Sequence, residues 1–158
     1  MFQVVFIAAA IIAASIHITF SPTRRGSAAA IAETYLQYLL FIYVGVMGLF
    51  VAAGHVFRPV QTSASIGWAP SPYEFEVGMA DLTIGVLGVL CLKFRGNFWL
   101  ATAVATAVWF LGDGVGHIRD LFIHNNHAPN NSGVFLVAEL LMPIVILLLV
   151  LYRRKATP

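Results

Sequence analysis

The stretch FLGDGVGHIRD, residues 110–120, places an acid and an imidazole four residues apart at the end of an apolar run. Residues i and i+4 share one face of an α-helix, so Asp113 and His117 can offer a carboxylate oxygen and a ring nitrogen to one metal ion. The pair could also hold a proton, or act only as a polar contact between helices. An ionised side chain inside a membrane costs at least about 2.5–3.5 kcal/mol, so partners from other helices must stabilise it.

The composition of the chain explains why these two residues stand out. Of its 158 residues, 59% are hydrophobic and 10% are charged. A soluble domain has about 25% charged residues, so this chain is expected to lie in a lipid bilayer. We predict one domain, residues 1–158. The only cysteine, Cys91, excludes a disulfide framework and a cysteine-based zinc site.

Five apolar stretches are long enough to cross a bilayer, which takes about 20 residues in a helix. We therefore predict an all-α integral membrane bundle of five transmembrane helices, at about residues 2–20, 35–57, 74–92, 97–118 and 133–152. The segments between them are rich in Pro, Gly, Ser and Asn, which predicts loops. The first stretch lacks the basic residues that open a signal peptide, so we expect a retained helix. Because it is short and rich in alanine, the alternative is four transmembrane helices plus a peripheral N-terminal helix.

The basic residues predict the orientation of the bundle. Seven of them lie at one side of the predicted membrane: Arg24, Arg25, Lys93, Arg95, Arg153, Arg154 and Lys155. Only Arg58 and Arg119 lie at the other side. Since cytoplasmic loops carry the excess of Lys and Arg, we expect the N-terminus outside and the C-terminus in the cytoplasm.

This orientation brings most acids and histidines to the outer half of the bundle. Seven of them lie at or near the outer ends of four predicted helices: His55, Glu74, Glu76, Asp81, Asp113, His117 and Glu139. Asp81, Asp113 and Glu139 lie inside their helices and therefore have the strongest need for a partner. His124 and His127 lie in an Asn-rich outer loop and are expected to be solvated.

Glycines fall on the same helix faces as these polar residues. The third predicted helix carries one stripe of acids and glycines: Glu74, Gly78, Asp81, Gly85 and Gly88. Gly45 and Gly48 share a stripe with His55 in the second helix, and Gly112 and Gly116 accompany the polar pair of the fourth. Small residues let helices approach closely in lipid, so we expect these polar groups to face other helices.

The first functional hypothesis is a site for a metal ion or a small polar ligand in the outer half of the bundle. The predicted metal ligands are His55, Glu76, Asp113 and His117. The predicted ligand-binding residues are Trp68, Glu76, Asp81 and Glu139. Carboxylates mixed with imidazoles suit a divalent ion such as zinc, iron or manganese better than copper(I), which prefers sulfur.

Two other functions stay open. The chain could be a non-catalytic accessory subunit whose glycine stripes pack against a larger membrane complex or a second copy. It could also be a quinone-linked redox component, in which Trp68, Tyr73 and Phe75 line a headgroup site beside Glu76. Trp68, Trp99 and Trp109 are further expected to anchor the helices at the lipid interface. We expect no nucleic-acid partner, because the only basic cluster is the short tail YRRKATP.

Four runs resemble a small family of prokaryotic multi-helix membrane proteins, catalogued as a domain of unknown function: SIGWAPSPYEFEVGMADLTIGVLGVL, FRGNFWLATAV, FLGDGVGHI and NHAPNN. The resemblance covers about residues 40–152. It implies a compact helical bundle in a prokaryotic cytoplasmic (inner) membrane and carries no established activity or ligand set. A looser likeness to the DoxX-like membrane proteins, some of them tied to quinone-linked redox chemistry, rests on bundle size and glycine-rich helices.

Overall fold

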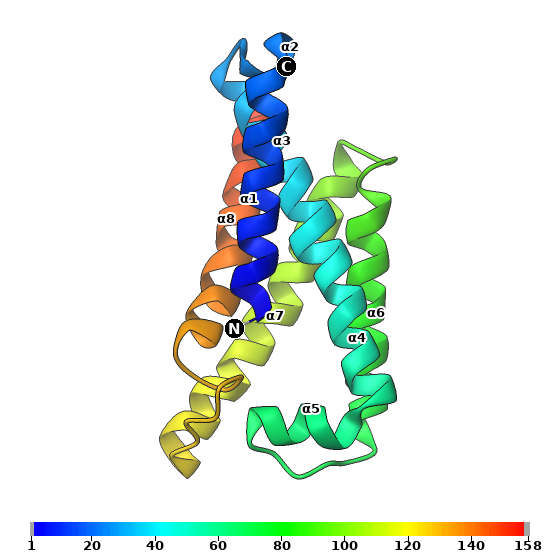
Figure 1. Ribbon diagram of the computed structural model, residues 1–158, viewed down its shortest axis with the longest axis vertical. Coiled ribbons are helices and arrows are strands. Elements are labelled where there is room, and N and C mark those ends of the chain that lie inside the picture. The colour runs from blue at the N-terminus through cyan, green and yellow to red at the C-terminus, as the bar shows by residue number, and fades with distance from the viewer. Residues whose placement is uncertain (1, 157–158) are drawn as a thin grey trace.

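The computed structural model describes residues 2–156, and every regular element in that range is a helix (Figure 1). The long helices are α1 (Phe2–Phe20), α6 (Tyr73–Leu90), α7 (Asn97–His124) and α8 (Val134–Ala156). A further long segment is continuous from α3 (Ala28–Tyr38) through the π-helix η1 (Leu39–Val46) to α4 (Met47–Phe57). Two short helices complete the fold, α2 (Pro22–Arg25) and α5 (Pro59–Ile66). The prediction of an all-α bundle is confirmed.

Four of these segments are long and apolar enough to cross a membrane: α1, α3–η1–α4, α7 and α8. These segments indicate a membrane protein. Helix α6 is not among the four, and its 18 residues include three acids, Glu74, Glu76 and Asp81. The count of four agrees with the alternative prediction of four transmembrane helices. The four segments differ from that alternative, because they include the N-terminal helix α1 and leave out α6.

The helices extend further than the hydrophobic stretches predicted. Ser27 caps α3 by accepting a hydrogen bond from the Ala30 amide, so this helix begins before residue 35. Helix α7 continues to His124 and ends at Asn125, whose φ of 54° is left-handed. The loop expected between residues 57 and 74 contains α5, which has Pro59 in its first turn. Capping residues, rather than the ends of the apolar runs, determine these boundaries.

The continuous segment η1–α4 and helix α6 pack closely through glycines on both sides. A Cβ atom added to Gly45 would lie 2.8 Å from the Val89 nitrogen, and one added to Gly85 would lie 2.7 Å from the Leu49 nitrogen. Neither position can hold a larger residue without moving a backbone. The stripes predicted in the second and third helices therefore do bring two backbones together.

The glycine prediction for α7 is wrong. A Cβ at Gly112 or Gly116 would meet open space, whereas one at Gly114 would lie 2.6 Å from the Leu140 side chain of α8. Gly112 and Gly116 lie on one face of α7, and Gly114 lies on a different face, which is turned towards α8. The close contact between α7 and α8 is therefore made at Gly114, and not at Gly112 or Gly116 as predicted.

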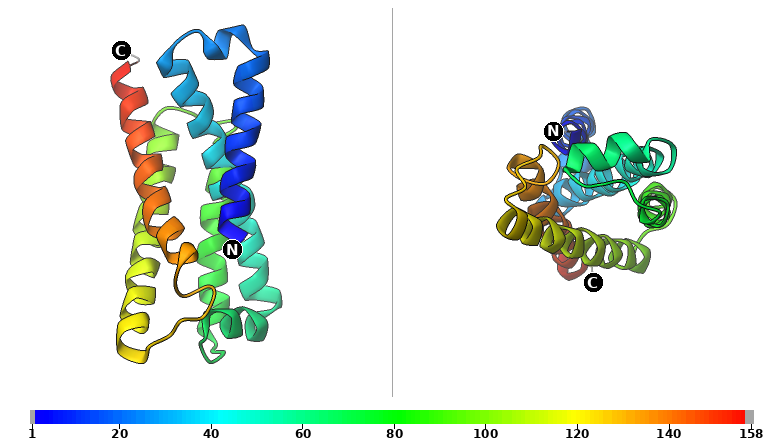
Figure 2. Two further views of the ribbon diagram at one scale, coloured as in Figure 1. Left: turned by 60° about the vertical axis from the view of Figure 1, so that its left-hand side comes forward. Right: turned by 90° about the horizontal axis from the view of Figure 1, so that it is seen from below.

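The helices form two walls, one of α4 and α6 and the other of α7 and α8. The two walls contact each other little. The N-terminus of α1 lies about half-way along the molecule, and Phe2 contacts Phe50 of α4 and Phe135 of α8, each with ring centroids 5.8 Å apart (Figures 1 and 2). Seen from below in Figure 2, α5, α6 and α7 surround the centre of the molecule. We call this the α5 end of the bundle, and the opposite end, with α2 and the C-terminus, the α2 end.

Candidate functional site

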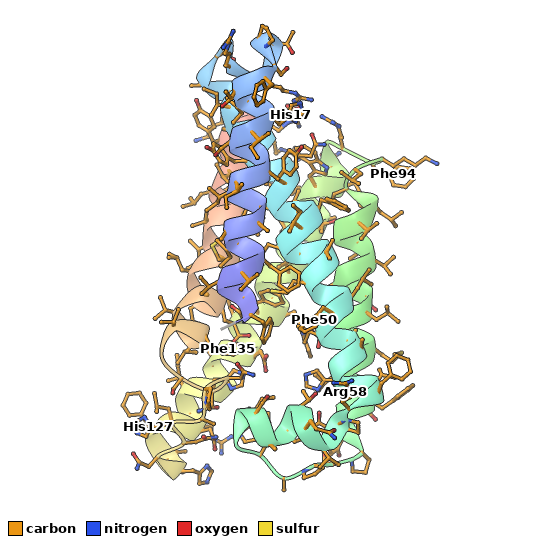
Figure 3. All side chains as sticks on the ribbon, in the orientation of Figure 1. His17, Phe50, Arg58, Phe94, His127 and Phe135 are labelled. Atoms are coloured by element: carbon orange, nitrogen blue, oxygen red, sulfur yellow. The ribbon has the colours of Figure 1, made fainter. Side chains whose placement is uncertain are left out.

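A cavity of about 640 Å³ lies between the two walls towards the α5 end. Its volume is in the range of about 300–1,000 Å³ that holds small molecules in proteins. Figure 3 shows Phe50, Phe135 and Arg58 around it, between the N-terminus of α1 and helix α5. Six acids and histidines line it: His55, Glu74, Asp81, Asp113, His117 and Glu139. The walls thus combine aromatic rings with a concentrated set of ionisable groups.

His117 of α7 is the most deeply buried of these groups, with 2% of its surface exposed. Its Nδ1 atom lies 2.7 Å from the Asn131 Oδ1 atom. Its Nε2 atom lies 3.6 Å from Asp113 Oδ2 and 3.7 Å from Glu139 Oε2. Both separations are too long for a hydrogen bond. The ring is therefore anchored through one nitrogen and presents the other to two carboxylates.

The loop before α8 determines which nitrogen of His117 carries a proton. The Asn131 Nδ2 atom donates a hydrogen bond to the Asn126 carbonyl, at 2.8 Å, so the Asn131 Oδ1 atom must be the acceptor. His117 Nδ1 is then the donor. In the neutral ring, the Nε2 lone pair faces Asp113 and Glu139. Such a ring has the tautomer and the orientation of a metal ligand.

Glu139 of α8 completes this group and has a buried oxygen without a partner. Only 4% of its surface is exposed, and its Oε2 atom makes no hydrogen bond with any residue in the described range 2–156. The Gln3 side chain lies against Glu139 and also has a buried oxygen, Oε1, without a partner in that range. Buried polar groups in proteins are nearly always paired. An ion or a proton at this position would supply the missing partner.

Asp113, His117 and Glu139 together offer three ligand atoms that lie within 4.8 Å of one another. We call these residues the His117 group. Trp68 stacks on the imidazole, with ring centroids 5.3 Å apart and an interplanar angle of 23°. Phe135 meets the same ring edge-on at 5.6 Å. These two aromatic contacts hold the imidazole plane in place.

On the opposite wall, His55 of α4 and two acids of α6 form a second set, which we call the His55 group. His55 Nδ1 lies 2.7 Å from Glu74 Oε2, and the Ser63 hydroxyl donates to Glu74 Oε1 at 2.5 Å. His55 Nε2 lies 3.9 Å from Asp81 Oδ2. The Trp109 indole donates to the other Asp81 oxygen at 2.8 Å.

Comparison with protein families supports the resemblance found in the sequence. The model of a family of unknown function (DUF6790) matches residues 1–158. The chain belongs to this family. The chain matches no curated protein and no solved structure. The family description assigns no activity, and the likeness to DoxX-like proteins stays a prediction.

The structure brings six of the seven predicted site residues to the cavity: His55, Trp68, Asp81, Asp113, His117 and Glu139. Glu76 is the exception, because its side chain is exposed on α6 and is not part of the cavity lining. Residues two positions apart in an α-helix are separated by about 200° around its axis, so Glu76 and Glu74 point to opposite faces. Glu74 is the acid on the buried stripe, and it replaces Glu76 in the site.

The residues of the quinone hypothesis do not gather at the cavity, and that hypothesis stays a prediction. Tyr73 and Phe75 are 69% and 58% exposed, and neither lines the cavity. Each lies about 100° from Glu74 around α6, on opposite sides of the buried stripe. Of the three residues expected to surround a headgroup beside Glu76, only Trp68 borders the cavity.

Several residues of the site were not predicted from the sequence. Asn131 is fully buried although it comes from an Asn-rich segment that reads as a solvated loop. Trp109 was expected to anchor α7 at the lipid interface, yet it donates a hydrogen bond to Asp81. His124 and His127 of the same region are exposed, as predicted. Nothing in the local sequence distinguishes Asn131 from its half-buried neighbours Asn130 and Ser132, so only Glu74, on its glycine stripe, had a usable signal.

Proposed function

We propose that the protein binds a divalent metal ion, such as zinc, iron or manganese, through His117 Nε2 and the carboxylates of Asp113 and Glu139. One observation carries this proposal: the unpartnered Glu139 oxygen lies 3.7 Å from a ring nitrogen whose other nitrogen is already anchored by Asn131. A cation between these atoms would satisfy the carboxylate and use the nitrogen lone pair. The mixed nitrogen and oxygen ligands suit these three metals.

The distances between the ligand atoms support an ion of this kind. Two atoms that each lie about 2.1 Å from one ion are about 3.4 Å apart at a tetrahedral angle. The observed separations of 3.6 and 3.7 Å exceed this value by only a few tenths of an ångström. Small side-chain rotations would therefore bring His117 Nε2 and either carboxylate to bonding distance of one ion.

Three protein ligands leave at least one coordination position open towards the cavity, which is typical of catalytic rather than structural metal sites. The cavity could deliver water or a small molecule to that position. At its rim, the Arg58 side chain makes no hydrogen bond or ion pair with any other residue between 2 and 156. A ligand that combines an apolar body with a carboxylate or phosphate would match the aromatic wall and Arg58 together.

A second candidate function is proton binding by the same three residues. It is supported by the position of His117 Nε2, which lies within 3.7 Å of both acids. A protonated imidazole would stabilise the two carboxylates without a metal ion. The accessory-subunit hypothesis stays a prediction, and purification of the chain at a fixed ratio with other proteins would support it.

Metal analysis of the detergent-purified protein tests the metal proposal. We expect bound metal in the wild type and the loss of one equivalent in His117→Ala, because the nitrogen ligand is removed. His124→Ala is the matched control, since His124 lies on the same helix with its side chain 70% exposed. A wild type without stoichiometric metal would contradict the proposal and favour proton binding. Metal content that is unchanged in His117→Ala would also contradict it.

A further inference from the structure

The arrangement around His117 recurs on the other wall of the cavity. His55 is 8% exposed, and like His117 it is anchored through Nδ1 and has a carboxylate oxygen opposite Nε2. The two histidines come from different helices, α4 and α7, and their acids come from α6 in one case and from α7 and α8 in the other. Two independent parts of the chain therefore present an imidazole nitrogen and a carboxylate to the same space.

Glu74 determines which nitrogen of His55 is protonated. An ionised carboxylate only accepts hydrogen bonds, so the contact of 2.7 Å makes His55 Nδ1 the donor. The Ser63 hydroxyl occupies the other Glu74 oxygen and holds the carboxylate in this orientation. Histidines that bind metals almost always donate their second N–H to a carboxylate or carbonyl in this way. His55 Nε2 is thereby left facing the cavity with its lone pair.

Asp81 supplies the second ligand atom. The Trp109 indole, which can only donate, holds Asp81 Oδ1, so Oδ2 remains towards His55. The separation of 3.9 Å between Oδ2 and His55 Nε2 is too long for a hydrogen bond and leaves space for an ion. The gap is similar to those in the His117 group.

The charges in the cavity also favour more than one cation. Four acids line it: Glu74, Asp81, Asp113 and Glu139. Asp81, Asp113 and Glu139 line the same cavity, so the two groups belong to one site. One divalent ion offsets only two of the four negative charges. A cation beside Asp81 would offset part of the negative charge that remains.

We propose that the cavity binds a second divalent cation between His55 Nε2 and Asp81, opposite the ion of the His117 group. This inference rests on the proposed function, because it makes that metal site one half of a two-metal centre. Two cations in one cavity can hold an oxygen-rich ligand between them and stabilise negative charge that develops on it. Glu74 acts here as a positioning residue for His55 rather than as a metal ligand.

Counting bound manganese tests the second site. The full chain is purified in detergent, stripped with a chelator and titrated with Mn²⁺ alone. We expect two Mn²⁺ per chain in the wild type, one in His55→Gln and one in His117→Gln. Asp81→Asn is also expected to retain one, because the asparagine oxygen still accepts from Trp109 while the charged ligand is lost. Glu76→Gln, an exposed acid on the same helix, is the matched control and should retain two.

The outcomes separate this inference from the proposed function. One Mn²⁺ in the wild type that is lost in His117→Gln but unaffected by His55→Gln and Asp81→Asn would overturn the second site and leave the first intact. No Mn²⁺ in the wild type would overturn both. If His55→Gln does not fold, Asp81→Asn alone decides, since it replaces the side chain with one of nearly equal size. Two Mn²⁺ in Asp81→Asn would then count against the second site.

Discussion

The two ends of the bundle both gather acids and basic side chains, but they balance their charges in opposite ways. At the α2 end, a single acid, Glu33 of α3, meets three arginines: Arg24 at 3.4 Å, Arg95 at 2.9 Å and Arg153 at 2.8 Å. At the α5 end, four acids share a cavity with two histidines, and the only arginine on its lining is Arg58. The first cluster has an excess of positive charge and the second an excess of negative charge.

The α2 end has the character of a structural cluster. Arg95 and Arg153 also lie over the Trp99 ring, at 5.3 and 5.1 Å from its centroid. The Trp99 indole donates to the Cys91 carbonyl at 2.9 Å. These contacts join α3, α7 and α8 around one carboxylate whose oxygens both have partners. Such a cluster stabilises the fold without needing a ligand.

The α5 end has the opposite character, because its polar atoms are held in place but not all of them are paired. Glu139 Oε2 has no hydrogen-bond partner among the described residues, and both histidine Nε2 atoms lie more than 3.5 Å from the facing carboxylates. The comparison shows that a count of acids and histidines does not identify a site. Buried polar atoms without a hydrogen-bond partner are more informative, because such atoms are rare in proteins and can accept a ligand.

Removal of metal should give the largest difference between the two ends. We expect EDTA to lower the thermal stability of the wild type, because the cavity acids lose the cation that stabilises them. An ion present at about 1,000 times its Kd contributes about 4 kcal/mol to stability. Thermal melts with and without EDTA measure the effect. EDTA should lower the Tm of His117→Ala much less. An equal Tm shift in both proteins would contradict the claim that a cation stabilises the acids of the α5 end.

Glu33→Gln should affect stability but not metal content. The substitution removes the charge that three arginines share, and hydrogen bonds to charged groups are worth about 1.5–3 kcal/mol. Because the Glu33 side chain is 19% exposed, partial screening by solvent places the expected loss at the lower end of that range. Chemical denaturation gives the stability and metal analysis gives the content. Loss of bound metal in Glu33→Gln would show that the two ends are not independent.

Asn131→Ala should act on the site and leave the α2 end unaffected. Without the Asn131 oxygen, His117 loses the partner that determines its tautomer and ring orientation. Loss of such a supporting contact typically weakens metal binding by about 10- to 100-fold. Mn²⁺ titration measures the change, with His127→Ala, an exposed residue of the same loop, as the control. An unchanged affinity would mean that the loop does not position the imidazole.

Composition and spacing by themselves determined that the chain is a membrane helical bundle and that certain residues share helix faces. The α-helical period places Glu74 with Asp81, and Asp113 with His117, whatever the rest of the molecule does. The predicted interface anchor Trp99 shows the limit of this reasoning, since it is 1% exposed and lies beneath two arginines. A residue's position along a helix does not determine which neighbour its side chain meets.

Only the tertiary structure decided the partners in the site. His117 with Asn131, His55 with Glu74 and Trp109 with Asp81 are hydrogen-bonded pairs that connect separate helices, or a helix and a loop. Each pair depends on how far one helix is rotated and shifted against another, which is determined by the close glycine contacts of α4 with α6 and by the loop before α8. Helix periodicity is a local property of the chain, whereas these rotations result from the packing of the whole bundle.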